Sequence, residues 1–158
     1  MGLDTTISLK NVNIYQHENL VLHEVNLEIE KGEFVYLIGK TGSGKSSLLK
    51  TLYADLGLKE GEGEVVGYDL KTIKTKDIPF LRRKLGTIFQ DFQLLSDRSV
   101  EENLRFVLQA TGWKNNGEMN ERVDDVLKKV GLPTKKHKFP HQLSGGEQQR
   151  LAVARVLL

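Results

Sequence analysis

A short stretch of glycine, lysine and serine residues carries the clearest chemical signal in the sequence. Residues 39–46 read Gly-Lys-Thr-Gly-Ser-Gly-Lys-Ser and match the pattern G-x-x-x-x-G-K-[ST] at every fixed position. Glycines lack a Cβ atom, so such a loop can turn its backbone N–H groups toward an anion. Lys45 can reach the β- and γ-phosphates, and the Ser46 hydroxyl can bind Mg²⁺. The pattern therefore indicates a nucleoside triphosphate site, without saying which nucleotide binds.

The segments on either side of this loop must hold it in place. Residues 34–38 read Phe-Val-Tyr-Leu-Ile, an apolar run typical of a strand that is buried on both faces of a parallel sheet. After the loop, apolar residues recur at helical spacing over positions 48–56, and Gly57 is placed to end the helix. This order of strand, glycine loop and helix is the context the motif requires, and it favours a phosphate site over a glycine-rich turn with a chance lysine.

Size and composition restrict the class of protein. The 158 residues suffice for one domain, and 23 basic against 21 acidic residues give a net charge of only +2. With no cysteine, the sequence has neither disulfides nor thiolate metal ligands. No apolar run approaches the length of a membrane span, and no secretory signal is visible. Basic residues do gather over positions 71–84, but without interleaved aromatic residues they indicate a solvated face, and we expect no nucleic acid partner.

The remainder of the chain separates into sheet and helix. Apolar and polar residues alternate over positions 24–30, which predicts an antiparallel strand with one wet face within a β-rich first thirty residues. Residues 85–89 predict a second buried strand, which ends at Gln90. Ser99 and Glu102 form a capping box, and we interpret residues 92–140 as a mostly helical insertion. Residues 135–138, Lys-Lys-His-Lys, are most simply a wet loop.

A second candidate anion site lies near the end of the sequence. Residues 143–150 read Leu-Ser-Gly-Gly-Glu-Gln-Gln-Arg, in which Ser144 and Glu147 make another capping box. Gly145 and Gly146 weaken the helix and leave bare N–H groups at its start, as at a phosphate site. An ordinary capped helix is the alternative interpretation. Tyr15 likewise has two interpretations, packing within a sheet or stacking on a base.

Two candidate phosphate-binding helix starts, with a glutamine after a buried strand between them, resemble the ATPase domain of ABC transporters over the whole chain. Residues 39–46 look like its Walker A motif. Residues 143–147 look like its signature motif, with Glu147 where glutamine is often found. Gln90 matches the Q-loop glutamine, which in that family helps to bind Mg²⁺ and senses the membrane partner. Tyr15 matches the aromatic residue that stacks on adenine, so the resemblance favours the stacking interpretation.

The resemblance implies a fold and a set of site residues. The fold class is α/β, a P-loop NTPase of the ABC type with an antiparallel β subdomain, a parallel-sheet core and a helical insertion. Residues 1–158 would form a partial ATPase domain, with the β subdomain and P-loop core in 1–91 and the mostly helical subdomain in 92–158. Lys45 and Gln90 would act in catalysis, and Ser46 and Gln90 would hold Mg²⁺. ATP would be bound by Tyr15, Gly39, Lys40, Thr41, Gly42, Ser43, Gly44, Lys45, Ser46 and Ser47. Ser144, Gly145, Gly146 and Glu147 would act in trans on the nucleotide of a second subunit.

Within the family, residues 89–98 and Asn103 are most similar to ATP-binding proteins of bacterial cell division, with Asp97-Arg98 as the discriminating pair. This implies an ATPase subunit on the cytoplasmic face of the cell membrane that forms a homodimer and pairs with an integral membrane, permease-like subunit. We expect Phe92, Leu94 and Leu95 to form an exposed apolar patch that docks this partner, and packing under the helical insertion is the alternative for any one of them. Two different interpretations stay open, a lipoprotein-releasing or macrolide-export ATPase and a nucleotide-switched scaffold. A GTPase or small-molecule kinase is disfavoured, because residues 144–146 have no role in either.

One departure from the family pattern is large. Family members continue into an apolar strand that ends in Asp-Glu, the Walker B pair, and then into a switch histidine. Neither follows here. We therefore expect the chain to be part of a longer protein and to be inactive as an ATPase by itself, because the general base for water attack is missing.

Overall fold

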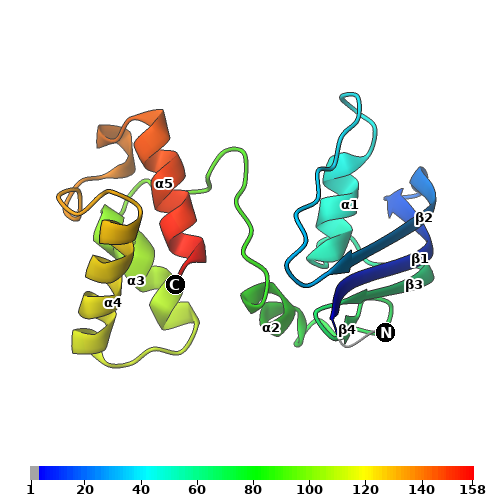
Figure 1. Ribbon diagram of the computed structural model, residues 1–158, viewed down its shortest axis with the longest axis horizontal. Coiled ribbons are helices and arrows are strands. Elements are labelled where there is room, and N and C mark those ends of the chain that lie inside the picture. The colour runs from blue at the N-terminus through cyan, green and yellow to red at the C-terminus, as the bar shows by residue number, and fades with distance from the viewer. Residues whose placement is uncertain (1–3) are drawn as a thin grey trace. The chain divides into compact units, whose positions relative to one another are not determined.

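The computed structural model describes residues 4–158, which fall into two compact units, residues 4–85 and 86–158. The first unit is built on a sheet and the second on helices (Figure 1). Each unit has its own hydrophobic core, and the two are described separately below.

The first unit contains a four-stranded antiparallel sheet. Its strands are β1 (Thr5–Gln16), β2 (Asn19–Glu30), β3 (Glu60–Val65) and β4 (Tyr68–Asp69), in the order β2-β1-β3-β4. In the β1–β2 hairpin Leu9 pairs with Leu27 and Val12 with Val25, so the apolar side chains gather on one face. The predicted antiparallel β structure of the first thirty residues is confirmed.

Two helices complete this unit, α1 (Lys45–Leu52) and α2 (Ile78–Arg83). Helix α1 lies beside the sheet (Figure 1), and its buried Leu48 joins the core that the sheet presents. Leu81 of α2 is fully buried in the same core. The helix predicted after the glycine loop is therefore present, and packing of one face fixes it to the sheet.

The two buried parallel strands predicted at residues 34–38 and 85–89 do not form. Both segments are irregular, and the side chains of residues 34–38 are exposed, Phe34 by 80 % and Ile38 by 86 %. The rings of Phe34 and Tyr36 meet edge to face, with centroids 4.8 Å apart. A parallel strand is stable only when neighbours on its edges satisfy its N–H and C=O groups, and no strand among residues 4–158 pairs with either segment. The parallel-sheet part of the predicted fold is therefore wrong for the described residues.

The second unit contains three α-helices and one turn of 3₁₀ helix: α3 (Val100–Ala110), α4 (Asn116–Lys129), η1 (Pro140–Gln142) and α5 (Gly145–Val156). Helix α3 starts with the predicted capping box, in which the Glu102 N–H donates to Ser99 Oγ and the Ser99 N–H to the Glu102 carboxylate. The three α-helices bury a common core with the side chains Val100, Leu104, Leu108, Met119, Val123, Val126, Leu127, Leu151 and Ala154. The predicted helical character of residues 92–140 is therefore confirmed.

The segment after Gln90 carries the three apolar residues that were predicted to form an exposed patch. Phe92, Leu94 and Leu95 are only partly exposed, and Leu94 packs against the helical core. The backbone at Phe92 and Gln93 is left-handed, with φ of 57° and 45°, and the Arg155 guanidinium donates to the Gln93 carbonyl at 2.7 Å. Leu94 is therefore folded back onto the helical core, as in the alternative interpretation, and docking of a membrane partner by Phe92 and Leu95 stays a prediction.

One buried polar side chain ties that turn to α3. Asn103 is fully buried, and its amide nitrogen lies within 3.1 Å of the carbonyl oxygens of Leu95, Arg98 and Ser99. Its amide oxygen accepts from the Leu95 N–H at 2.9 Å. A single side chain therefore satisfies several main-chain groups of residues 95–99, which lie on the N-terminal side of α3.

We expect Asn103→Ala to destabilise the helical unit by about 2 kcal/mol or more, because it leaves buried main-chain groups without a partner. Urea unfolding followed by the fluorescence of Trp113 tests this, since Trp113 is the only tryptophan and packs against the helical core. The exposed Gln109→Ala in the same helix is the control and should change stability by less than about 0.5 kcal/mol. Equal effects of the two substitutions would contradict the role of Asn103.

Candidate functional site

The glycine loop connects residues 34–38 to α1, and its conformation depends on glycine at two positions. Gly42 and Gly44 have φ of 81° and 87°, in the left-handed region. A Cβ on Gly44 would lie 2.8 Å from the side chain of Leu22 and 3.1 Å from that of Val21, both on β2. The loop therefore passes directly over the sheet at a place where only glycine fits.

Helix α1 begins with free donor groups. Gly44 is its N-cap, so no side chain caps the first turn, and that turn contains no acidic residue. The first N–H groups of a helix have no partner within it and carry a partial positive charge. Such a start, next to an open glycine loop, suits a phosphate group.

Lys45 lies over the loop. Its ammonium group donates to the carbonyl oxygens of Gly39 at 2.8 Å and Lys40 at 2.7 Å, and it lies 3.3 Å from Ser43 Oγ. The side chain thus spans the ring of residues that would surround a phosphate. Of the other predicted contacts, Thr41 and Ser46 are exposed, whereas Ser47 lies on the buried face of α1.

The oxygen atoms of Ser46 and Gln90 are of the kind that binds Mg²⁺. The exposed Ser46 hydroxyl sits in the first turn of α1, where phosphate oxygens would complete the coordination of a hard cation. Gln90 is also exposed and offers an amide oxygen, but it lies in the second unit, so joint ligation by this pair stays a proposal. No group of three His, Cys, Asp or Glu side chains that could hold a metal ion occurs among residues 4–158.

Tyr15 lies near the end of β1, in the same unit as the loop. It pairs with Leu20 across the hairpin, and the preceding Ile14 pairs with Leu22, the residue that approaches Gly44. The phenol hydroxyl donates to Glu60 Oε1 at 3.1 Å, and the Lys59 ammonium lies 5.6 Å from the ring centroid. The hairpin therefore links the strand that carries Tyr15 to the strand whose Leu22 contacts the loop.

The predicted second helix start has the expected cap. Ser144 is the N-cap of α5; its hydroxyl accepts from the Glu147 N–H at 3.3 Å, and its own N–H donates to Glu147 Oε2 at 2.8 Å. The Gln148 amide donates to the carbonyls of Pro140 and Leu143, which fixes the approach to the helix. Gly145 and Gly146 are exposed.

A lysine that the sequence pattern assigned to a wet loop belongs to this helix start. Lys135 Nζ lies 3.1 Å from Glu147 Oε1, on the side of the carboxylate that does not cap Ser144. The Ser144 N–H and then Lys135 hold the pKa of the Glu147 carboxyl below its ordinary value. Its neighbour Lys136 is also paired, with Asp124 at 2.8 Å. The only signal in the sequence was that a basic residue, Lys135, precedes the acidic capping residue Glu147. The sequence alone could not show that the two side chains form an ion pair.

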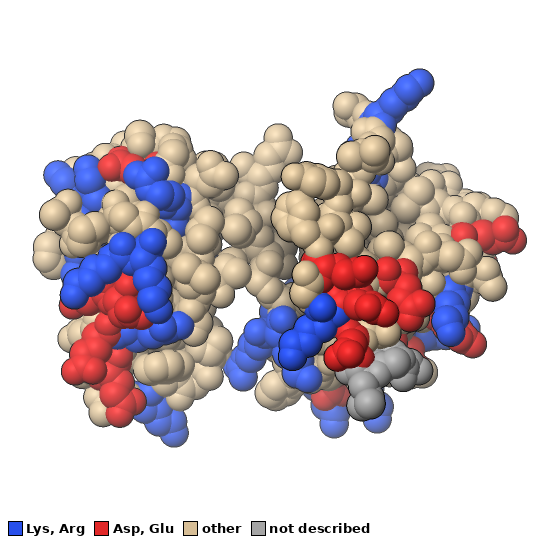
Figure 2. Space-filling view, viewed as in Figure 1, with Lys and Arg blue, Asp and Glu red and all other residues tan. Residues whose placement is uncertain are grey.

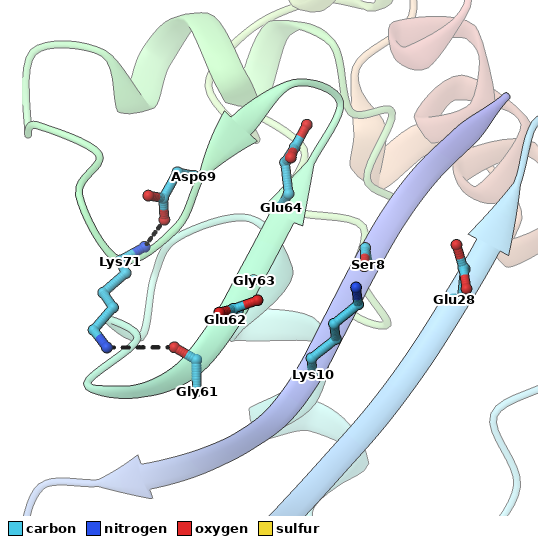
Figure 3. Close-up of a pocket in the computed structure, with 9 residues that line it drawn as sticks. All are labelled: Ser8, Lys10, Glu28, Gly61, Glu62, Gly63, Glu64, Asp69 and Lys71. Atoms are coloured by element: carbon cyan, nitrogen blue, oxygen red, sulfur yellow. Dashed lines mark hydrogen bonds between the residues drawn. The ribbon is translucent and has the colours of Figure 1, made fainter. Parts of the chain in front are cut away.

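A hollow on the outer face of the sheet contains none of the predicted site residues. Its volume is about 530 Å³, and it is lined by Ser8, Lys10, Glu28, Gly61, Glu62, Gly63, Glu64, Asp69 and Lys71 (Figure 3). Lys71 donates from its N–H to Asp69 and from its ammonium to the Gly61 carbonyl. Figure 2 shows acidic side chains gathered on this unit. Four carboxylates against two lysines disfavour a phosphate ligand here, so the glycine loop remains the candidate site.

Comparison with known proteins agrees with this geometry. The model of the ABC transporter family matches residues 22–158. The cell division ATP-binding protein FtsE of Streptococcus pneumoniae is 40 % identical over 147 residues, which cover 93 % of this chain and 64 % of the relative. The methionine import ATP-binding protein MetN of Helicobacter pylori is 41 % identical over 152 residues, 96 % of this chain and 46 % of that protein. The chain thus spans less than two thirds of the length of either relative.

A solved structure shows the same fold. The ATP-binding cassette MJ0796, determined as a dimer in a post-hydrolysis state with ADP and Pi, matches with a TM-score of 0.83 and 34 % identity, over 96 % of this chain and 69 % of the other. The fold and the family match together define an ATP-binding domain of the ABC type. This chain belongs to the ABC transporter family. In the part of the chain that the structure describes, no helix is long and apolar enough to cross a membrane.

We expect the Glu147 carboxyl to titrate below its ordinary range, and Lys135→Met to raise its pKa, because the nearest positive charge is removed. Since the folded-state pKa is lowered, the stabilisation that this carboxylate gives to the start of α5 is present above the unfolded-state pKa and is lost as pH falls through the folded one. Carbon-13 NMR titration measures both effects.

Lys138→Met is the control for this titration, because it removes a lysine from the same loop without removing the partner of Glu147. An unchanged pKa in Lys135→Met, or an equal change in Lys138→Met, would show that the ion pair does not hold the carboxylate.

Proposed function

We propose that this chain is the nucleotide-binding part of an ABC-type ATPase subunit that couples ATP to a permease-like membrane subunit. The observation that carries the proposal is Lys45, whose ammonium spans the glycine loop beside the uncapped start of α1. A triphosphate would replace the loop carbonyls as its partner and receive the free N–H groups of the helix.

The remaining residues take roles around that anchor. The backbone of residues 39–44 surrounds the β- and γ-phosphates, and Ser46 with Gln90 holds Mg²⁺, whose charge offsets that of the phosphates. Ser47, whose side chain is buried in α1, completes the nucleotide-binding set, and Tyr15 stacks on the base. Residues 1–91 and 92–158 then act as the nucleotide-binding and signature parts of one ATPase domain.

The second helix start acts on a neighbouring subunit. In a two-fold dimer, Ser144 and the N–H groups of Gly145 and Gly146 approach the nucleotide held by the loop of the other subunit, because a symmetric pair of self-complementary surfaces gives two identical sites. MJ0796, the matched cassette, is dimeric with ADP and Pi. ATP would then hold the dimer together, since its phosphates lie between two positive helix ends.

The cellular role we propose is in cell division and cell-wall remodelling. It is supported by residues 89–98 with Asp97-Arg98 and by the 40 % identity to FtsE, and the partner would be an FtsX-like membrane subunit at the cytoplasmic face of the membrane. MetN, at 41 %, favours import of a small molecule as a second candidate. A lipoprotein-releasing or macrolide-export ATPase would use the same nucleotide site, and so would a nucleotide-switched scaffold. ATPase rates of the full-length subunit with and without its membrane partner separate an enzyme from a scaffold.

We expect Lys45→Ala to weaken ATP binding by about 10- to 100-fold, because it removes charge-assisted hydrogen bonds to the phosphates. Calorimetry on the 158-residue chain measures this, and that chain should bind ATP without turning it over. Lys50→Ala removes a lysine from the same helix that forms only a surface ion pair with Asp55, so it should leave affinity unchanged. The proposal fails if the two variants bind ATP equally well.

Sites formed in trans are tested with full-length subunits, one carrying Lys45→Ala and the other Ser144→Arg. In the mixed dimer, one site then carries both defects and the other carries neither. We expect a substantial part of wild-type ATPase activity in this dimer and none in either mutant homodimer. A mixed dimer without activity would instead indicate that each site forms within one chain.

A further inference from the structure

A carboxylate at the start of β3 holds the side chains of two β1 residues. Glu60 accepts a hydrogen bond from the Tyr15 hydroxyl at 3.1 Å through Oε1 and from the Asn13 amide at 2.6 Å through Oε2. The register of β1 and β3 places Asn13 directly opposite Glu60. Both carboxylate oxygens of Glu60 can therefore accept hydrogen bonds from β1 side chains while the two strands stay paired. Glu60 therefore bridges the two strands at the end of the sheet where Tyr15 lies.

These contacts fix the aromatic ring in two directions. Glu60 holds its rim through the hydroxyl, and the Lys59 ammonium covers one face at 5.6 Å from the centroid. Tyr15 is only half-buried, so packing alone does not determine its plane. A ring held at its rim and covered on one face presents its other face as a flat apolar surface of defined orientation.

The position of the ring relates it to the glycine loop. Leu22 closely approaches Gly44 of the loop and pairs with Ile14, the residue before Tyr15. All of these residues belong to the first unit, so their arrangement is fixed. The Ile14–Leu22 pair therefore connects the strand that carries Tyr15 to the loop where the phosphates would bind.

We propose that Glu60 is a positioning residue that holds the Tyr15 ring for stacking on the base of a nucleoside triphosphate. This inference rests on the proposed function of Tyr15 and of the loop. A ring ordered before the ligand arrives loses less side-chain entropy on binding, so the contribution of Glu60 appears in affinity for the base and not for the phosphates.

The test compares ATP with inorganic tripolyphosphate on the full-length protein, because the second ligand has the phosphates but no base. We expect Glu60→Ala to weaken ATP binding by about threefold to tenfold, a part of what base stacking contributes, and to leave tripolyphosphate binding unchanged. Unchanged tripolyphosphate binding also shows that the variant is folded. Glu62→Ala removes an exposed carboxylate from the same strand and should alter neither affinity.

A double-mutant cycle tests whether Glu60 acts through Tyr15. Tyr15→Phe removes the hydroxyl and keeps the ring, so it should weaken ATP binding as Glu60→Ala does, with no further loss in the double variant. Glu60→Gln keeps an acceptor for the hydroxyl and should restore most of the affinity. Glu60 also raises the pKa of the Tyr15 phenol, so in Glu60→Ala that pKa should fall toward its ordinary value by carbon-13 NMR.

Additive losses of ATP affinity in the double-mutant cycle would overturn this role of Glu60, and so would equal losses of affinity for ATP and tripolyphosphate. A third contrary result would be unchanged ATP affinity in Glu60→Ala when the wild-type protein binds ATP and Lys45→Ala weakens that binding. The last leaves the proposed function intact and removes only the role of Glu60. Absence of any ATP binding by the wild-type protein would overturn both.

Discussion

The close approach of Gly44 to Leu22 is the steric constraint on which the site depends. Gly44 has a left-handed backbone, with φ of 87°, and a Cβ there would meet the side chains of Leu22 and Val21, so glycine is favoured where the loop backbone lies against β2. The sheet therefore supports the loop, and the ligand groups that we propose there are main-chain donors whose positions need no side-chain ordering.

The two helix starts differ in the charge placed beside them. At α1 the cap is a glycine, and the positive Lys45 adds to the partial positive charge of the helix start. At α5 the cap is Ser144 with an acidic residue behind it, and Lys135 offsets that acid. The start of α1 has a glycine cap and leaves its N–H groups open to a ligand. At the start of α5 the capping box uses the Glu147 N–H, so the donors that stay available are the N–H groups of Gly145 and Gly146. This division suits one helix that binds an anion and a second that closes on it.

Local patterns predicted local structure well, and contacts between distant segments not at all. The capping boxes at Ser99 and Ser144 involve residues three apart, so their residue types suffice to identify them. Residues 34–38 have the composition of a buried strand. A strand also needs neighbouring strands that pair with its N–H and C=O groups, and the composition of the segment does not show whether such strands are present. Likewise, the partner of Glu147 lies 12 residues upstream and that of Tyr15 lies 45 residues downstream, so only the fold could reveal either pair.

The irregular segment 34–38 also bears on how the chain behaves at high concentration. Five uncharged, β-prone side chains in a row, exposed and unpaired, form the kind of segment that recruits identical segments into cross-β stacks. Lys31 and Glu33 before it and Lys40 after it are charged, and stacking would bring like charges into register. These flanking residues act as gatekeepers, so the colloidal stability of the chain should depend on ionic strength more steeply than its net charge of +2 suggests.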